Sequence, residues 1–344
     1  MTTQPSLKEN NLFGAIDLGT NTCRLLISKC VPTSSGLTLE HIDSLSRVIR
    51  FGEHIVQTKQ LSAQSIERAV IALEECQKRL SFHHVTAFRC VATAACRYAE
   101  NTEFFVEEAF KKTGVRIEVI TPEEESELAI AGCFELFDPK FPYVIVFDIG
   151  GGSTELVWAE IKNNIEFKIL GTISFPYGFA TLKEQLKNEE SKEQITHFFS
   201  YEMNEFAIRH GIYEAIRQNK VQLIGASGTI TTLAAIIMNL EVYDKTKVHE
   251  ARLYKQNIDN VIRYLKATRY ADRANHPCIG PQRADSIMGG IALFEAIYDI
   301  IPIEPIIAAD RGVREGILYT LAKKHMDEGE KSKETVVDKK EKSQ

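Results

Sequence analysis

The chain has 344 residues, of which 44% are hydrophobic and 26% are charged, and its formal net charge is −6 at pH 7. This length is sufficient for two domains with separate hydrophobic cores. The negative charge argues against indiscriminate nucleic-acid binding, which requires a broad basic surface, so we expect no nucleic-acid partner.

The chain contains no run of eighteen or more apolar residues, and residues 1–10 lack the charged start and apolar middle of a signal peptide. We therefore expect a cytoplasmic protein with no membrane partner. The seven cysteines are odd in number, lie in apolar contexts and form no C-x-x-C pair. They predict reduced core thiols rather than a disulfide framework or a zinc site.

Strand and helix patterns follow one another along the chain as in an α/β protein. Apolar runs predict strands at 13–17, 24–29, 37–49, 85–91, 116–120, 143–148, 154–161, 167–174 and 222–225. Ser62 can cap a helix that reaches Arg79, and another helix begins at Pro122, where three glutamates follow at the positive end of the helix dipole. Hairpin strands followed by helices occur twice, which predicts two duplicated domains with a cleft between them.

Two stretches that are 131 positions apart nearly repeat each other: residues 15–22 read AIDLGTNT and residues 146–153 read VFDIGGGS. Each is an apolar run that ends in Asp, turns on Gly and continues through hydroxyl or amide residues. Glycine lets backbone N–H groups approach an anion, and the Asp is placed where a divalent cation or its water would lie. One copy alone is equally typical of an ordinary turn, whereas two facing copies would clamp a phosphoanhydride.

The duplicated hairpins resemble the phosphate loops of the superfamily that includes actin, the Hsp70 ATPase domain and the sugar kinases. The strand at 221–225, followed by a Gly-Ser-Gly turn, fits a third element of that superfamily, which lies against the nucleotide. Finer patterns resemble the exopolyphosphatase/guanosine pentaphosphatase (Ppx/GppA) phosphatase family in its short, two-domain form. These patterns are DIGGGSTEL at 148–156, GASGTI at 225–230, RAD at 283–285 and DRGVREG at 310–316.

The resemblance implies an α/β fold of two actin-like, ribonuclease-H-like domains with an interdomain cleft. We expect the N-terminal domain to comprise residues 12–131 plus 309–325 and the C-terminal domain to comprise residues 132–308. Residues 326–344 combine Lys, Glu, Asp and Ser with only two adjacent valines, and we predict a disordered tail without chemistry.

The resemblance also implies a hydrolase that releases the terminal phosphate from inorganic polyphosphate, guanosine pentaphosphate (pppGpp) or both. Glu125 matches the family's catalytic glutamate, which orients or deprotonates water, and Arg97 would place a positive charge on the terminal phosphoryl group. Asp148 and Glu155 match the acids that hold Mg²⁺, and Asp148 is also counted as catalytic. The expected phosphate-binding residues are Asp17, Gly19, Thr20, Asn21, Thr22, Gly150, Gly151, Gly152, Ser153, Gly228 and Thr229.

Other interpretations remain open on the residues alone. Glutamates at a helix start commonly stabilise the dipole, and the arginines and aspartate of the RAD and DRGVREG patterns are typical of structural ion pairs. The N-terminal third is the expected wall that attracts a polyanion, because it contains Arg24, Arg47, Arg50, Lys59, Arg89 and Arg97. An actin-like ATPase, a sugar-kinase-type phosphotransferase and a non-catalytic polyphosphate or pppGpp sensor are the alternatives. The resemblance also implies a possible homodimer.

Overall fold

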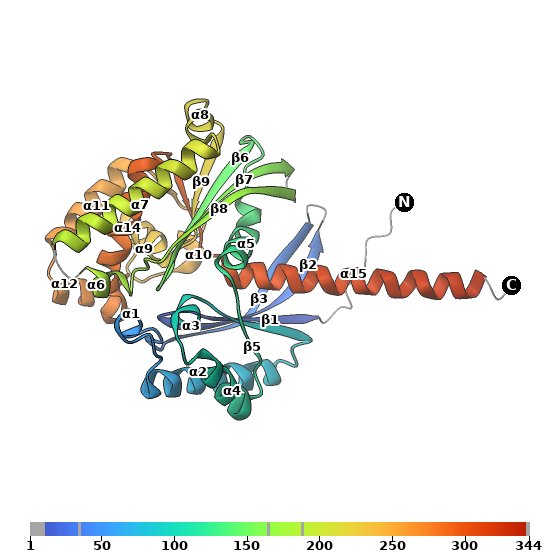
Figure 1. The fold of residues 1–344 in the computed structure, drawn as a ribbon. Coiled ribbons are helices and arrows are strands. Elements are labelled where there is room, and N and C mark those ends of the chain that lie inside the picture. The colour runs from blue at the N-terminus through green and yellow to red at the C-terminus, as the bar shows by residue number, and fades with distance from the viewer. Residues whose placement is uncertain (1–10, 34–35, 164–165, 187–188, 342–344) are drawn as a thin grey trace.

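The structure is a computed structural model that describes residues 11–33, 36–163, 166–186 and 189–341. It contains a five-stranded sheet built from the first part of the chain and a six-stranded sheet built from the second part. Helices cover both sheets, and Figure 1 shows the two layered units side by side. The predicted α/β fold with two duplicated units is confirmed. No helix in the described ranges is both long and apolar enough to cross a membrane.

The first sheet has the strand order β3-β2-β1-β4-β5. Its first three strands form antiparallel hairpins, and β4 and β5 continue the sheet in parallel. Alternate residues of β2, among them Leu25 and Ile27, are buried in one core with the helices that cover this face. The strands are β1 (Leu12–Leu18), β2 (Thr22–Thr33), β3 (Gly36–Val48), β4 (Ala87–Ala92) and β5 (Ile117–Val119), and the helices are α1 (Ile55–Thr58), α2 (Ala63–Phe82), α3 (Ala94–Tyr98) and α4 (Thr102–Thr113).

The second sheet has the order β10-β11-β9-β6-β7-β8 and repeats the hairpin-plus-parallel arrangement. Each of the nine predicted strands overlaps a strand of the structure, whereas β10 and β11 were missed because they are only two and three residues long. The strands are β6 (Tyr143–Ile149), β7 (Thr154–Asn163), β8 (Glu166–Phe175), β9 (Val221–Gly225), β10 (Arg252–Leu253) and β11 (Ile306–Ala308). The helices are α6 (Leu182–Gln185), α7 (Glu189–Arg209), α8 (Ile212–Arg217), α9 (Gly228–Ile237), α10 (Lys245–Val248), α11 (Lys255–Ala267), α12 (Tyr270–Asn275), α13 (Gly280–Arg283) and α14 (Ser286–Ile300).

Both predicted helix starts are present. Ser62 caps α2 by accepting a hydrogen bond from the Ser65 N–H at 3.1 Å. The second predicted helix is α5 (Pro122–Cys133), which a short 3-10 helix, η1 (Phe134–Leu136), follows. The hydroxyl of Thr121 caps α5 by accepting the Glu124 N–H at 3.2 Å. All seven cysteines are free and buried, as predicted.

Helix α5 lies between the two sheets and packs on both of them. Leu128 and Ala129 belong to the core of the first sheet, and Ile130 and Cys133 belong to a core with β6 and β7. The C-terminal helix α15 (Val313–Glu341) crosses α5 and packs on β1 and β2. The crossing is very close, since a Cβ placed on the α15 residue Gly316 would lie 2.0 Å from a backbone oxygen of α5. This arrangement puts the first turn of α5 at the junction of the two sheets.

The structure differs from the prediction of a disordered tail at 326–344, because α15 continues to Glu341. Figure 1 shows the end of α15 projecting away from both sheets. The prediction of disorder was based on the small apolar surface that this segment can bury. Lys and Glu nevertheless favour a helix, and extending an existing helix avoids the cost of nucleation. Residues 342–344 lie outside the described ranges, and the predicted domain bounds stay a prediction.

Candidate functional site

A cleft of about 520 Å³ lies between the two sheets and is lined by both hairpin tips and by the starts of α5, α9 and α15. The tips that the sequence singled out have the same turn. The Gly19 N–H donates to the Thr22 carbonyl at 2.9 Å, and the Gly150 N–H donates to the Ser153 carbonyl at 2.9 Å. The repeated sequence therefore forms a repeated loop, one on each side of the cleft.

The two tips are in contact with each other. A Cβ on Gly152 would lie 2.4 Å from the Thr20 hydroxyl oxygen and 3.0 Å from Ala94 Cβ, and a Cβ on Gly151 would lie 3.2 Å from the Asn21 nitrogen. Distances this short leave no room for a larger side chain. The glycines of the second tip are therefore needed for the two loops to meet.

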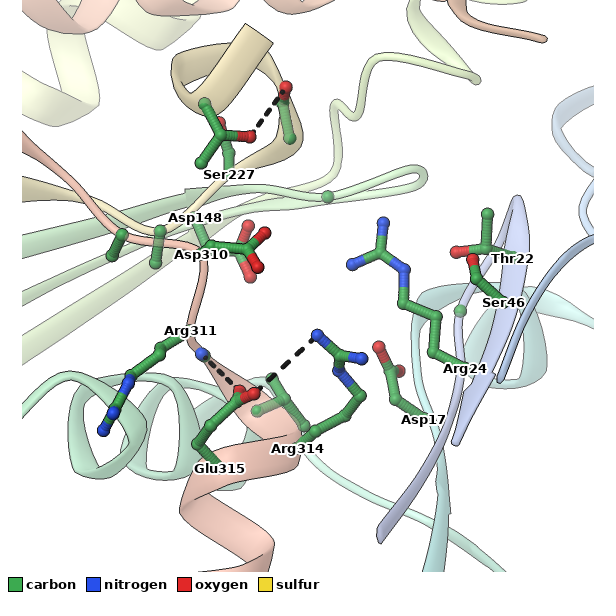
Figure 2. A pocket seen from close by; sticks show the side chains of 18 of the residues that line it. Asp17, Thr22, Arg24, Ser46, Asp148, Ser227, Asp310, Arg311, Arg314 and Glu315 are labelled. Atoms are coloured by element: carbon green, nitrogen blue, oxygen red, sulfur yellow. Dashed lines mark hydrogen bonds and ion pairs between the residues drawn. The ribbon is translucent and has the colours of Figure 1, made fainter. Parts of the chain in front are cut away.

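The two hairpins differ in the charge of the residue that lies across the strands from the aspartate of the repeat: it is a cation in the first hairpin and an acid in the second. Asp17 lies directly opposite Arg24 in the first hairpin, whereas Asp148 lies directly opposite Glu155 in the second. Figure 2 shows the Arg24 guanidinium extending from the first sheet toward Asp148 and Asp310 on the other side of the cleft. The first hairpin thus contains its own cation, and the second contains two carboxyl groups on one face.

Burial raises the pKa of these acids above their ordinary values. It raises the pKa of Asp17, although the neighbouring Arg24 opposes the change. It raises the pKa of Asp148 to about 7, and the charge of Glu125 contributes in the same direction. The second hairpin is therefore short of positive charge.

Glu125 lies in the first turn of α5, is 8% exposed and lines the cleft. Arg97 Nη1 donates to Glu125 Oε2 at 2.8 Å and to the Ile120 carbonyl at 3.1 Å. Burial raises the pKa of Glu125 to about 8, the charge of Glu155 adds to the shift, and Arg97 offsets only part of it. The neighbouring Glu124 instead pairs with Arg89, whose Nη2 lies 2.6 Å from Glu124 Oε1.

The carboxyl groups of Glu155 and Asp148 have a donor chemistry that fits a hard divalent cation. Glu155 is 1% exposed, and burial raises its pKa to about 7. Its Oε1 accepts the Ser174 hydroxyl at 3.0 Å, while Oε2 is buried without a hydrogen-bond partner. Among the described residues no set of three or more His, Cys, Asp and Glu side chains forms a metal site by itself. Mg²⁺ commonly takes one or two carboxylates and completes its shell with phosphate oxygens and water, so these residues fit a cation shared with substrate.

Most of the predicted residues meet in the cleft, but three lie outside its wall. Arg97 holds Glu125 from outside the cleft wall, and Glu155 lies beside Asp148 as its cross-strand partner. The contact of Arg97 with the phosphoryl group stays a prediction. Thr229 packs on α14, since a Cβ on Gly290 would lie 2.1 Å from its hydroxyl. The predicted residues that line the cleft are Asp17, Gly19, Thr20, Asn21, Thr22, Glu125, Asp148, Gly150, Gly151, Gly152, Ser153 and Gly228.

The expectation of an attracting wall in the N-terminal third was wrong for most of its residues. Arg47 Nη2 lies 2.6 Å from Glu75, and the guanidinium of Arg89 is held by two glutamates. Of the six basic residues named for this wall, the cleft is lined only by Arg24. The register of the predicted hairpin, which places residue 24 opposite Asp17, was the signal that could have identified it.

The other Lys and Arg side chains that line the cleft come from the second half of the chain: Lys245, Arg283, Arg311 and Arg314. Arg311 is paired with Glu135. Arg283 Nη1 donates to the Thr232 hydroxyl at 2.8 Å, and its guanidinium lies 5.4 Å from the centre of the Tyr243 ring. Figure 2 shows the Arg314 guanidinium between Glu315 and Asp17. The RAD and DRGVREG patterns, which we interpreted as ion pairs, therefore each supply a guanidinium to the cleft.

Comparisons with known proteins agree with this geometry. The model of the Ppx/GppA phosphatase family matches residues 28–325. Exopolyphosphatase 2 of Mycobacterium tuberculosis is 28% identical over 324 residues, which cover 90% of this chain and 98% of that protein. A bifunctional 3-dehydroquinate synthase/phosphatase of Fusobacterium nucleatum is 29% identical over 313 residues, which cover 88% of this chain but 45% of that protein.

The fold comparison gives the same result. The crystal structure of the Aquifex aeolicus member of the Ppx/GppA family superimposes with a TM-score of 0.72 at 28% identity, covering 92% of this chain and 98% of that one. The family model spans most of the chain and includes β3, β4 and β5 of the first sheet, α5, the whole second sheet and the start of α15. This chain belongs to the Ppx/GppA phosphatase family.

Proposed function

We propose that this protein is a phosphoanhydride hydrolase that releases the terminal phosphate from inorganic polyphosphate. The observation that carries the proposal is the position of Glu125, a buried carboxyl group in a cleft between two facing phosphate-loop hairpins. A carboxylate so placed can accept a proton from water beside a bound phosphoryl group. The similarity to an exopolyphosphatase supports polyphosphate as the substrate.

In this mechanism the two hairpin tips hold the terminal phosphate through backbone N–H groups and the hydroxyls of Thr22 and Ser153. The guanidinium groups of Arg24 and Arg314 balance the charge of the phosphoryl oxygens. A cation held by Asp148 and its cross-strand partner Glu155 would supply further charge neutralisation when bound. The cleft thus brings the terminal phosphate to the junction of the two sheets.

Water then attacks the terminal phosphorus in line with the bond to the next phosphate. Glu125 accepts one proton of this water, and the oxygen that bridges the two phosphates leaves with the bonding electron pair. The products are inorganic phosphate and a chain that is one phosphate shorter. Arg97 holds Glu125 Oε2, so that the carboxyl group keeps one orientation and Oε1 is available to the water.

The test is phosphate release with Mg²⁺ present, compared for long polyphosphate, tripolyphosphate, pppGpp and ATP. Release from polyphosphate supports the proposal. The predicted pppGpp activity depends on the same bond cleavage and is decided by the same assay. Hydrolysis of ATP alone would instead support the actin-like ATPase alternative, and tight polyphosphate binding without release would support the sensor.

A further inference from the structure

The cleft continues outward from the hairpin tips along the face of β2 and β3. On β2 the lining residues are Arg24, Leu26 and Ser28, which alternate along the strand. On β3 they are Leu39 and His41 and then, after a register shift, Ser44 and Ser46. The shift is a bulge opposite residues 27 and 28, and it turns both His41 and Ser44 toward the cleft.

The opposite wall of this outer part comes from α10, which begins at Lys245. Lys245 and Thr246 line the cleft from the second sheet's side, and the described residues place no carboxylate within ion-pair distance of Lys245. His41 lies near enough to Lys245 that the lysine charge lowers the pKa of the histidine, an effect second to that of burial. His41 on β3 and Lys245 on α10 therefore lie on opposite walls at the mouth of the cleft.

Charge separates the inner and outer parts of the cleft. The acids that line it, among them Asp17, Asp148 and Asp310, lie at the hairpin tips and the start of α15. The outer lining is composed of hydroxyls, two leucines, a histidine and a lysine: Leu26, Ser28, Leu39, His41, Ser44, Ser46, Lys245 and Thr246. The nearest carboxylate on α10, that of Asp244, accepts the N–H and the hydroxyl of Thr246 at 2.9 and 2.7 Å and lies outside the cleft lining. The serine hydroxyls, His41 and Lys245 therefore face this part of the cleft without a carboxylate in its lining, which favours an anion.

We propose that this outer part of the cleft binds the phosphates of a polyphosphate chain beyond the scissile bond, with His41 and Lys245 as the outermost contacts. The inference rests on the proposed function, because it takes the terminal phosphate to be held at the hairpin tips. The substrate that fits this outer part is a linear polyanion long enough to extend from the hairpin tips to α10.

The strand register sets the minimum length. Ser28, the partner of His41, follows Arg24 by four residues along β2. Four strand residues span about 13 Å. One P–O–P link spans about one strand residue, so phosphates held directly over Arg24 and His41 are about four links apart. Tripolyphosphate, with two links, is shorter than this span, whereas hexaphosphate, with five, covers it.

The experiment measures equilibrium binding of tripolyphosphate, hexaphosphate and long-chain polyphosphate to the Glu125→Gln protein, which prevents turnover during the measurement. Lys245→Ala and His41→Ala are added to it singly and together. The matched controls are Lys247→Ala, which removes an exposed lysine of α10 outside the cleft wall, and Glu40→Ala on β3.

Each cleft substitution should weaken hexaphosphate binding by about two- to fivefold, as expected for exposed ion pairs, and the double substitution by about tenfold. Tripolyphosphate binding should change much less, and the controls should match the parent. An equal loss for tripolyphosphate and hexaphosphate, or the same loss in Lys247→Ala, would overturn the proposal. If the parent binds none of the three phosphates, the proposed function itself fails, whereas tight binding without any effect of the cleft substitutions refutes only the outer contacts.

Discussion

Arg97 and Glu125 form an ion pair that joins two elements of the cleft. Arg97 lies on α3, Glu125 lies in the first turn of α5, and the Nη1 to Oε2 distance is 2.8 Å. Both side chains are largely shielded from water. In such surroundings an ion pair holds its geometry, and the partner that loses its contact is left with an unpaired polar group.

We expect Arg97→Gln to lower kcat for polyphosphate hydrolysis by about ten- to hundredfold, the effect of losing a charge-assisted hydrogen bond in a buried setting. KM should change little, because Arg97 lies outside the cleft wall. Arg97→Lys should restore part of the activity. Steady-state kinetics on the three proteins test this role, and a large rise in KM with unchanged kcat would show that Arg97 contacts substrate instead.

Removal of metal should abolish turnover, since Asp148 and Glu155 form a buried pair with an unpartnered carboxyl oxygen. Addition of EDTA should stop phosphate release, and excess Mg²⁺ should restore it. Asp148→Asn should raise the Mg²⁺ concentration needed for half-maximal rate. Asp285→Asn is the control, because Asp285 is an exposed partner of Lys183. If Asp148→Asn needs the same Mg²⁺ concentration as the parent for half-maximal rate, Asp148 does not hold the metal.

The ion pair between Asp43 and Arg79 should make stability depend on pH. Partial burial favours a higher pKa for Asp43, but hydrogen bonds from Arg79 and His83 outweigh it, so the pKa is lowered. A lowered pKa stabilises the fold above the unfolded-state value of about 3.9, and this contribution disappears as the pH falls through the folded-state pKa.

Asp43→Asn should therefore lower the thermal midpoint at pH 7 by roughly 2–4 °C, the shift for about 1 kcal/mol in a domain of this size. The difference from the parent should shrink as the pH falls below about 3.9 and vanish once the pH is below the folded-state pKa of Asp43. Thermal scans of both proteins across this range provide the measurement. If the thermal midpoints of the two proteins differ by the same amount at pH 7 and at the acidic end of the scans, the substitution acts through packing rather than charge.

Deletion of residues 326–344 should leave the thermal midpoint and the phosphate-release rate essentially unchanged. The deleted part of α15 projects away from the sheets in Figure 1, whereas Ala322 and His325, which pack on the first sheet, are retained. Ile317→Ala, within the packed part, should instead destabilise the protein by about 2–5 kcal/mol. A clear loss of stability or rate in the truncated protein would show that the projecting helix has a partner.

The sequence predicted both hairpins and both sheets because their signals are local. Asp, Gly and hydroxyl residues at fixed offsets specify the turn, and apolar runs specify the strands on either side. Thr121 and Pro122 likewise specify the start of α5, so the position of Glu125 on a helix followed from neighbouring residues.

The remaining features depend on contacts between distant parts of the chain. Nothing near Lys245 or Arg314 in the sequence indicates that tertiary packing brings them to one cleft with Arg24. The same is true of Arg97, whose place outside the cleft wall depends on its hydrogen bonds to the Ile120 carbonyl and to Glu125. The tail prediction was wrong for 326–341 because low apolar content limits burial but does not prevent the extension of a packed helix.

The central claim is that Glu125 positions or deprotonates the attacking water. Single-turnover hydrolysis of polyphosphate by Glu125→Gln and Glu124→Gln tests it most directly, with equilibrium binding measured in parallel. Glu125→Gln keeps the size of the side chain but removes the base, so the rate should fall by about 10² to 10⁴ while binding persists. Glu124 is paired with Arg89 and does not line the cleft, so Glu124→Gln should leave the rate nearly unchanged. Full activity in Glu125→Gln, or the large loss appearing in Glu124→Gln instead, would contradict the mechanism.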